Sequence, residues 1–201
     1  MIVNKHLLDK VRVEVQEVVK AIADRTEKEL GLNIKVTEGC RTYEVQEAYY
    51  AQGRKPLEEV NKLRKKAGLP PIEAKKNLII TYAPAGHSAH NVCAAADIYL
   101  LDKNNKLVLE DYTLLKKFYA IVRKEVDKRN DITWGMDFTE FKDPPHLEYK
   151  HYRTLINKNT TVSTNQISSQ NKPNNTPNSK NNILLFLMAL GAITFAVMYK
   201  M

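Results

Sequence analysis

Hydrophobic residues recur every three or four positions near the start of the chain, with charged residues between them. The recurring positions are Leu8, Val11, Val15, Val18, Val19 and Ile22. This spacing places the apolar side chains on one face of a helix, so it predicts an amphipathic α-helix over residues 4–30. Residues 1–9 contain neither a long apolar run nor a small-residue cleavage site, which predicts a chain made and folded in the cytoplasm.

The next part of the chain, up to residue 150, mixes helical and strand-like patterns. We expect a short strand at 33–38, helices at 43–53, 56–67 and 112–128, and β-rich segments at 78–82, 96–101 and 106–109. Asp102-Lys-Asn-Asn105 is typical of the turn between the last two of these β-rich segments. A final short strand holds His146-Leu-Glu-Tyr149. Helices and short strands in this order predict a domain of the α+β class.

The composition changes abruptly towards the C-terminus. Residues 157–182 contain nine Asn and eight Ser or Thr among 26 residues. Such a segment cannot bury enough apolar surface to offset the entropy lost on ordering, so it predicts a disordered linker. Residues 183–199 form a run of 17 residues without a charge, which as a helix is about 25 Å long.

The apolar run predicts a single transmembrane helix, because the polar linker separates it from any core against which a soluble helix would pack. We therefore expect three parts: a folded domain over 1–156, a linker over 157–182 and a membrane span over 183–199. Lys172 and Lys180 precede the span and Lys200 follows it, a weak bias that favours a domain on the cytoplasmic side. The lipid bilayer is then one expected partner.

Charge and cysteine content exclude several classes of protein. The 31 Lys and Arg exceed the 23 Asp and Glu by +8, yet no segment packs five or six like charges together. This pattern argues against a nucleic-acid-binding arm. The densest run, Lys62-Leu-Arg64-Lys65-Lys66, indicates a solvated helix face. Two cysteines are too few for a disulfide-rich fold or an all-cysteine zinc site, and in the cytoplasm both thiols are expected to be reduced.

The candidate chemistry lies in a few histidines and carboxylates. His90 is followed seven residues later by Asp97, and His146 lies within Asp143-Pro-Pro-His146-Leu-Glu148. Two imidazoles and one carboxylate are a common catalytic zinc set, in which water takes the fourth position. Taken alone the pattern is weak, because a single histidine is more often structural. No His-Glu-x-x-His helix is present, so the geometry of that zinc-peptidase class is not expected.

Four blocks of the chain, in order, resemble the signatures of one family of zinc enzymes. Glu38-Gly-Cys-Arg41-Thr resembles E-G-Y-R-S, and residues 46–54 resemble Q-x-x-L-Y-A-Q-G-R. Residues 88–97 resemble S-x-H-x-x-G-x-A-x-D, and residues 134–148 resemble W-G-G-D-W…F-x-D-x-P-H-F-E. The family is that of the D-Ala-D-Ala carboxypeptidases and L-alanyl-D-glutamate endopeptidases, and the second block is typical of its phage-endolysin branch. The resemblance covers roughly residues 35–150.

The resemblance implies a hedgehog/D,D-peptidase-like fold, that is, a small antiparallel sheet with flanking helices. It also implies site residues: His90, Asp97 and His146 as ligands of Zn²⁺, Asp143 as the catalytic carboxylate, Arg41 as the group that holds the scissile carbonyl, and Ser88 as a substrate contact. Glu148 lies two residues after His146 on the expected strand and so on the same face. A supporting role for Glu148 and a plain surface carboxylate both stay open.

The other histidines and four departures from the family pattern complete the expectations. His87 is expected in a loop near the site, and His6 and His151 are expected to face solvent. The departures are Cys40 in place of tyrosine, Cys93 in place of glycine, and Met136 and Phe138 in place of glycine and tryptophan. Cys93 would crowd a turn that glycine relaxes. The two cysteines would lie near each other and pair in an oxidising space, although two reduced thiols remain the expectation.

The function implied by the resemblance is that of a zinc-dependent peptidoglycan peptidase, acting as a phage or prophage-type endolysin in cell lysis. Its expected partner is the peptidoglycan stem peptide, and the expected bond is L-Ala–D-Glu. Two alternatives stay open. The first is a D,D-carboxypeptidase that acts on D-Ala-D-Ala termini. The second is a membrane-tethered, catalytically inactive wall-binding module, which the departures at Cys93 and Met136 would favour.

Overall fold

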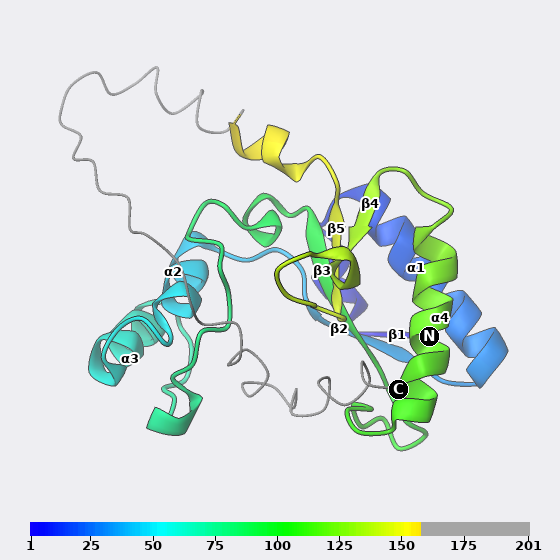
Figure 1. Ribbon diagram of the computed structural model, residues 1–201, viewed down its shortest axis with the longest axis horizontal. Helices are drawn as coiled ribbons and strands as arrows, with labels where there is room; N and C mark the ends of the chain where they lie inside the picture. The colour runs from blue at the N-terminus through cyan, green and yellow to red at the C-terminus, as the bar shows by residue number, and fades with distance from the viewer. Residues whose placement is uncertain (158–201) are drawn as a thin grey trace.

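The computed structural model describes residues 1–157, which form a five-stranded sheet with helices around it (Figure 1). The strands occur in the order β1-β2-β3-β5-β4. Their bounds are β1 Ile2–Val3, β2 Ile34–Glu38, β3 Ala95–Leu100, β4 Ile132–Trp134 and β5 His146–Tyr149. The α+β class is confirmed. The expected all-antiparallel sheet is corrected to a mixed one, because the two-residue edge strand β1 runs parallel to β2.

The main core lies between the sheet and two long helices, α1 Val13–Leu30 and α4 Tyr112–Val126. The buried residues of these elements belong to one cluster, which includes Val15, Val19, Ile22, Ile34, Val36, Ile98, Phe118, Ile121 and Leu147. Two shorter helices, α2 Tyr43–Ala51 and α3 Leu57–Lys66, pack against each other on the opposite side of the sheet from α1 and α4 (Figure 1). Burial of the apolar stripe on α1 and α4 is the main stabilising contribution to this part of the fold.

The long N-terminal helix predicted over 4–30 is divided in two. A 3₁₀ turn, η1 Lys5–Leu8, precedes α1, which begins only at Val13. Backbone groups of η1 and of the residues before α1 contact segments that are remote in sequence. Arg12 N–H donates to the carbonyl of Cys93 at 2.8 Å, and the backbone of Gly39 approaches Leu7 so closely that a Cβ there would lie 2.1 Å from the Leu7 oxygen. These tertiary contacts outweigh the helical periodicity of residues 4–12.

Two predicted strands are absent from the described part of the chain. Residues 78–82 are irregular, with bends at Leu78 and Tyr82, and have no ladder partner. Carbonyls in and next to this segment accept from side chains instead: Thr81 O from Arg54 Nη2 at 3.0 Å and Ala83 O from Gln46 Nε2 at 2.7 Å. Residues 106–109 form only one bridge, between Leu107 and Leu101. The three-residue strand β4 was not predicted, because it is too short for an alternation signal.

Cys40 and Cys93 form a disulfide, so the expectation of two reduced thiols is wrong. The bond joins the segment after β2 to the end of the short 3₁₀ helix η3 Ala89–Val92. Cys93 has a φ of +52°, the left-handed conformation for which glycine is the usual residue. Hydrogen bonds brace the same junction, because Arg41 N–H donates to the carbonyl of His90 at 2.9 Å. The disulfide therefore ties together the two segments that carry Arg41 and His90.

The expectation of a protein anchored in the membrane at its C-terminus is contradicted, and the bilayer as a partner finds no support in the described residues. None of the helices within residues 1–157 has the length and apolar character that crossing a membrane requires. The longest, α1, alternates buried valines with charged side chains such as Glu17, Lys20 and Asp24, so its polar face is solvated. The linker expected up to residue 182 and the span expected at 183–199 lie outside the described residues, apart from Asn157.

Breaking the disulfide is expected to destabilise the folded state. Cys40 and Cys93 are 53 residues apart in sequence. Closing a loop of that length lowers the entropy of the unfolded chain, which raises its free energy by about 4 kcal/mol at 25 °C. Reduction of the wild-type protein should therefore lower the free energy of unfolding, measured by urea titration, by up to about this amount. Reductant should leave a Cys40→Ala, Cys93→Ala protein unchanged. Identical unfolding curves for oxidised and reduced wild type would contradict the expectation.

Candidate metal centre

Register in the sheet brings two of the candidate side chains into one row with Glu38. Asp97 of β3 pairs with Glu38 of β2 on one side and with His146 of β5 on the other. Directly opposed residues of antiparallel strands project their side chains to the same face. The opposite face carries Ala96, Ile98 and Leu147, which are buried in the core. Core packing therefore turns Asp97 and His146 together towards the cleft.

His90 reaches the same place from η3, and its side chain is 3% exposed. Its ring Nδ1 lies 2.6 Å from the carbonyl of Gly39. Because a carbonyl can only accept, this contact assigns the ring proton to Nδ1 and leaves a lone pair on Nε2. The glycine is required here, since any side chain at position 39 would collide with the Leu7 carbonyl. Two close backbone approaches thus fix the orientation of the imidazole.

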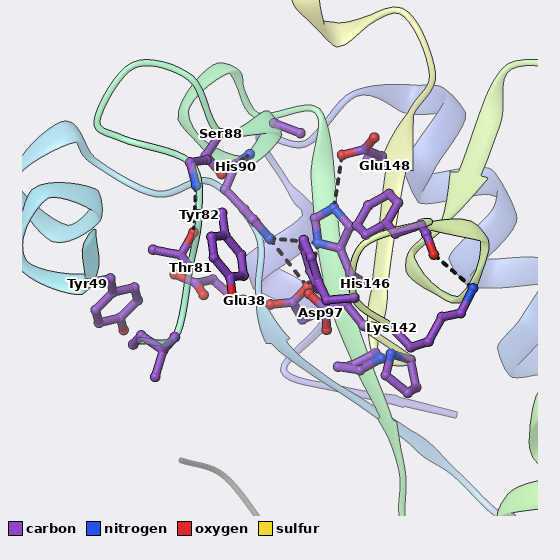
Figure 2. Close-up of a pocket in the computed structure, with 18 of the residues that line it drawn as sticks. Glu38, Tyr49, Thr81, Tyr82, Ser88, His90, Asp97, Lys142, His146 and Glu148 are labelled. Carbon is purple, nitrogen blue, oxygen red and sulfur yellow. Dashed lines mark hydrogen bonds and ion pairs between the residues drawn. The ribbon is translucent and has the colours of Figure 1, made fainter. Parts of the chain in front are cut away.

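Three ligand-type atoms converge in front of β3 (Figure 2). Asp97 Oδ1 lies 3.3 Å from His90 Nε2 and 3.0 Å from His146 Nδ1, and the two imidazole nitrogens are 3.2 Å apart. Tetrahedral Zn²⁺ with ligands at about 2.0–2.1 Å holds them about 3.4 Å from one another. The observed spacing and the donor set, two imidazoles and a carboxylate, therefore fit a zinc ion with little rearrangement.

Glu148 orients the second histidine. Its Oε2 lies 3.1 Å from His146 Nε2, so it accepts the ring proton and directs Nδ1 towards the cluster (Figure 2). Burial opposes a charge on His146, but the hydrogen bonds to Asp97 and Glu148 raise its pKa to about 10. Burial likewise opposes ionisation of Asp97, yet the two histidines lower its pKa well below the usual range. Of the two interpretations of Glu148, the structure supports a supporting role, as the hydrogen-bond partner of a histidine in the candidate metal site.

Asp143 lies beside the cluster in the loop before β5 and lines the same cleft. Its backbone N–H donates to the carbonyl of Gly135 at 3.1 Å, and a Cβ at Gly135 would lie 2.1 Å from the backbone carbonyl oxygen of Asp143. Trp134 Nε1–H donates to the carbonyl of Pro144 at 2.7 Å. The Trp-Gly pair of the fourth sequence block thus holds the Asp143 segment in place. Burial raises the pKa of Asp143 to about 6, with a further increase from the Asp97 carboxylate.

Arg41 lines the cleft with its guanidinium held by two partners. Nε donates to Glu38 Oε1 at 2.6 Å, Nη2 donates to the other oxygen of the same carboxylate, and Nη1 donates to Gln46 Oε1 at 2.7 Å. Burial lowers the pKa of Arg41, but the Glu38 carboxylate outweighs it and the net shift is upward. Sequence reasoning assigned no role to Glu38 or Gln46, although each opens one of the quoted blocks.

The remaining candidates fall near the positions expected for them. Ser88 lines the cleft, caps η3, and accepts the His90 N–H at 3.3 Å through Oγ. His87 is an exposed cleft residue, whereas His6 and His151 are exposed and lie outside the cleft lining. Phe138 lies within the cleft with its ring centroid 5.8 Å from that of His146. The cluster, Asp143, Arg41 and Ser88 therefore share one cleft of about 1450 Å³.

Comparison with known proteins gives a family match over the C-terminal half of this domain. Residues 81–149 match the model of a family described as D-alanyl-D-alanine carboxypeptidase. The peptidoglycan L-alanyl-D-glutamate endopeptidase CwlK of Bacillus subtilis (strain 168) is 31% identical over 121 residues, which cover 59% of this chain and 61% of that protein. The chain thus spans less than two thirds of this relative's length. The resemblance deduced from the four blocks is confirmed.

Two solved structures are also similar. The L-Ala D-Glu endopeptidase ChiX of Serratia marcescens has 15% sequence identity and a TM-score of 0.44, with 76% of this chain and 89% of that chain covered. The vancomycin resistance D,D-pentapeptidase VanY from a VanB-type resistance cassette, in complex with Zn(II), has 17% identity and a TM-score of 0.40. That alignment covers 73% of this chain and 78% of that chain.

Replacing Glu148 is expected to weaken metal binding. A Glu148→Gln side chain keeps the shape but removes the charge that holds the His146 ring, and loss of such a partner typically costs 10- to 100-fold in metal affinity. Competition with a chelator of known zinc affinity would measure the change. Glu140→Gln, at an exposed carboxylate in the same cleft, is the matched control. Equal zinc affinities for the two variants would show that Glu148 does not support the site.

Replacing Asp143 is expected to stabilise the metal-free protein at neutral pH. The pKa of Asp143 is raised from 3.8 to about 6 by burial, so its ionised form is disfavoured by folding. The stability that the protonated carboxyl contributes below pH 3.8 is lost as the pH rises through 6. Asp143→Asn should therefore raise the free energy of unfolding by about 3 kcal/mol at pH 7.5 and by little at pH 4. Urea titrations at both pH values would measure this, and an equal effect at each would refute it.

Proposed function

We propose that this relative of the D-alanyl-D-alanine carboxypeptidase family is a zinc-dependent peptidase that hydrolyses peptidoglycan stem peptides, with the L-Ala–D-Glu bond as its substrate. The observation that carries the proposal is the convergence of His90 Nε2, Asp97 Oδ1 and His146 Nδ1 beside Asp143 in one cleft. The choice of bond is supported by the name of the Bacillus subtilis relative. The process we propose is cell lysis of the endolysin type, which the second sequence block favours.

The three ligands would hold the metal with a fourth position for water, and the set of two neutral imidazoles and one carboxylate would leave a net charge of +1. When bound, Zn²⁺ lowers the pKa of a coordinated water to about 7 and polarises a carbonyl oxygen. Gly39 and Glu148 accept one ring proton from each histidine, so His90 Nε2 and His146 Nδ1 would give up any proton that they carry and offer their lone pairs to a bound metal. The residues present therefore suit this ion.

Asp143 would act as the general base and acid. Its pKa of about 6 lies close enough to neutrality for the carboxylate to take a proton from the attacking water and return it to the leaving amine. The position of the carboxylate is restricted by the two prolines that follow it, which fix their own φ angles. Its backbone is held against Gly135, so the side chain is presented from a rigid loop.

Arg41 would hold the scissile carbonyl oxygen. Three of its five N–H groups are used by Glu38 and Gln46, which leaves two for a substrate. A fixed cation at the site where negative charge develops stabilises the transition state more than the ground state. Ser88 accepts a backbone N–H through Oγ and retains its own hydroxyl proton, so it can donate to the peptide backbone of the substrate.

The cleft volume supports a peptide substrate. At about 1450 Å³ the cleft exceeds the roughly 300–1,000 Å³ typical of small-molecule pockets.

A second candidate reaction is D,D-carboxypeptidase cleavage of D-Ala-D-Ala termini, which the description of the matched family favours. The departures that suggested an inactive wall-binding module leave the site geometry intact: Cys93 adopts the turn conformation of glycine, and Met136 packs against the core.

Digestion of purified peptidoglycan tests the proposal. The full chain should release peptides with new amino termini, and chelation of the metal should abolish the release. Asp143→Asn should reduce the rate by about 10²- to 10⁴-fold, as expected for loss of a general base, while Glu110→Gln, at an exposed remote position, should be fully active. Fragment masses distinguish new D-Glu termini from released D-Ala. Metal binding without any Asp143-dependent cleavage would reject the enzyme and favour the wall-binding module.

A further inference from the structure

Arg64 is buried although it lies in the most basic run of the sequence. The run was expected to form a solvated helix face, and Lys62, Lys65 and Lys66 are indeed exposed. Arg64, in the last turn of α3, is only 8% exposed and lines the cleft that contains the metal centre. The expectation is therefore wrong for this one residue, because its side chain turns inward, between α2 and α3, towards the cleft.

The guanidinium of Arg64 has no acidic partner among residues 1–157. Nε donates to the carbonyl of Pro70 at 2.7 Å and Nη1 donates to Gln52 Oε1 at 3.1 Å. Both acceptors are neutral. By contrast, Arg41, the other largely buried arginine of the cleft, forms an ion pair with Glu38. A buried cation without a counter-charge is costly, so this position favours a ligand that brings the negative charge with it.

Tyr49 connects Arg64 to the catalytic end of the cleft. The guanidinium carbon of Arg41 lies 5.1 Å from the centroid of the Tyr49 ring, and that of Arg64 lies 5.9 Å from the same centroid. The two guanidinium carbons are thus at most about 11 Å apart, the length of about three extended residues. Tyr49 lies well to the side of the metal cluster, beyond Glu38 (Figure 2). A peptide whose scissile carbonyl is at Arg41 can therefore extend past Tyr49 to Arg64.

We propose that Arg64 is a carboxylate-binding residue that selects acidic stem peptides. The proposal rests on the proposed function and adds a substrate determinant to it. Two of the five N–H groups of the guanidinium are used by Pro70 and Gln52, so three are left for a carboxylate. The glutamyl residue beyond an L-Ala–D-Glu bond has two carboxyl groups, and only one is used in the onward peptide link. That free carboxylate, or one on the next residue, is the ligand.

The test compares synthetic stem peptides that differ in one charge. The reference peptide has a free D-Glu carboxylate and diaminopimelate as its third residue. One variant peptide has this D-Glu carboxylate as an amide, and another has lysine in place of diaminopimelate. For wild type, removing the carboxylate that Arg64 binds should lower kcat/KM at least tenfold, mainly through KM, because the contact is remote from the reacting atoms. The peptide that loses activity identifies which carboxylate is bound.

Protein variants then assign the preference to Arg64. Arg64→Gln keeps donors for the neutral acceptors but removes the charge, so it should cut the reference peptide as slowly as wild type cuts the peptide that lacks the relevant carboxylate. The two changes should not add, as expected for groups in direct contact. Arg64→Lys should retain part of the preference. Lys65→Gln, at the exposed neighbouring position, should retain all of it.

Equilibrium binding of the same peptides, measured by calorimetry, keeps this proposal separate from the proposed reaction. A binding preference for the acidic peptide that Arg64→Gln abolishes supports the subsite even if no peptide is cleaved, and such a result would reject only the peptidase. Equal binding and equal kcat/KM of the acidic and neutral peptides in wild type would overturn the subsite, whatever the variants do. A preference that persists in a folded Arg64→Gln protein would overturn it as well.

Discussion

The antiparallel pairing of β3 with β5 is the constraint on which the rest of the site depends. Ala96 pairs with Leu147 on the core side, and Asp97 pairs with His146 on the cleft side. A slip of one residue would exchange the two faces of β5, exposing Leu147 and burying His146 in an apolar core. Hydrophobic burial therefore enforces the register, and the register places a carboxylate and an imidazole about 3 Å apart. The metal-binding geometry is in this sense a product of core packing.

The two sides of the cleft contribute different chemistry. The sheet, η3 and the loop before β5 supply the metal-binding cluster and Asp143, whereas the segment after β2 and the helices α2 and α3 supply Arg41, Tyr49 and Arg64. The first side carries the Asp97, Asp143 and Glu148 carboxylates beside two imidazoles, and the second carries two largely buried guanidinium groups. A peptide between them meets groups suited to hydrolysis at one wall and groups suited to binding its oxygens and carboxylates at the other. The disulfide ties the segment that carries Arg41 to the one that carries His90, and so links the two walls.

Much of this arrangement could be predicted from the sequence, for reasons that differ between residues. β5 and α3 were placed almost to the residue, because their patterns are local: β5 begins directly after Pro145, and α3 lies between Pro56 and Gly68. The candidate ligands could be picked out because His90, Asp97 and His146 lie in motifs whose spacing resembles known signatures. What could not be predicted depends on contacts remote in sequence. The break in the N-terminal helix needs the carbonyl of Cys93, and the ordering of residues 78–83 needs the side chains of Gln46 and Arg54.

The disulfide has a consequence for how this chain can have diverged from the family pattern that it resembles, in which glycine takes the place of Cys93. A side chain in the left-handed conformation costs about 1–2 kcal/mol when nothing compensates for it. A cysteine at position 93 alone would carry that cost without forming a cross-link, whereas a cysteine at position 40 alone would only replace one partly buried residue of the core with another. The order of substitution with the smaller barrier therefore places Cys40 first. Reversion is then asymmetric as well: loss of either cysteine removes the cross-link, but loss of Cys40 also leaves Cys93 in the left-handed conformation, whereas glycine at position 93 relieves that strain.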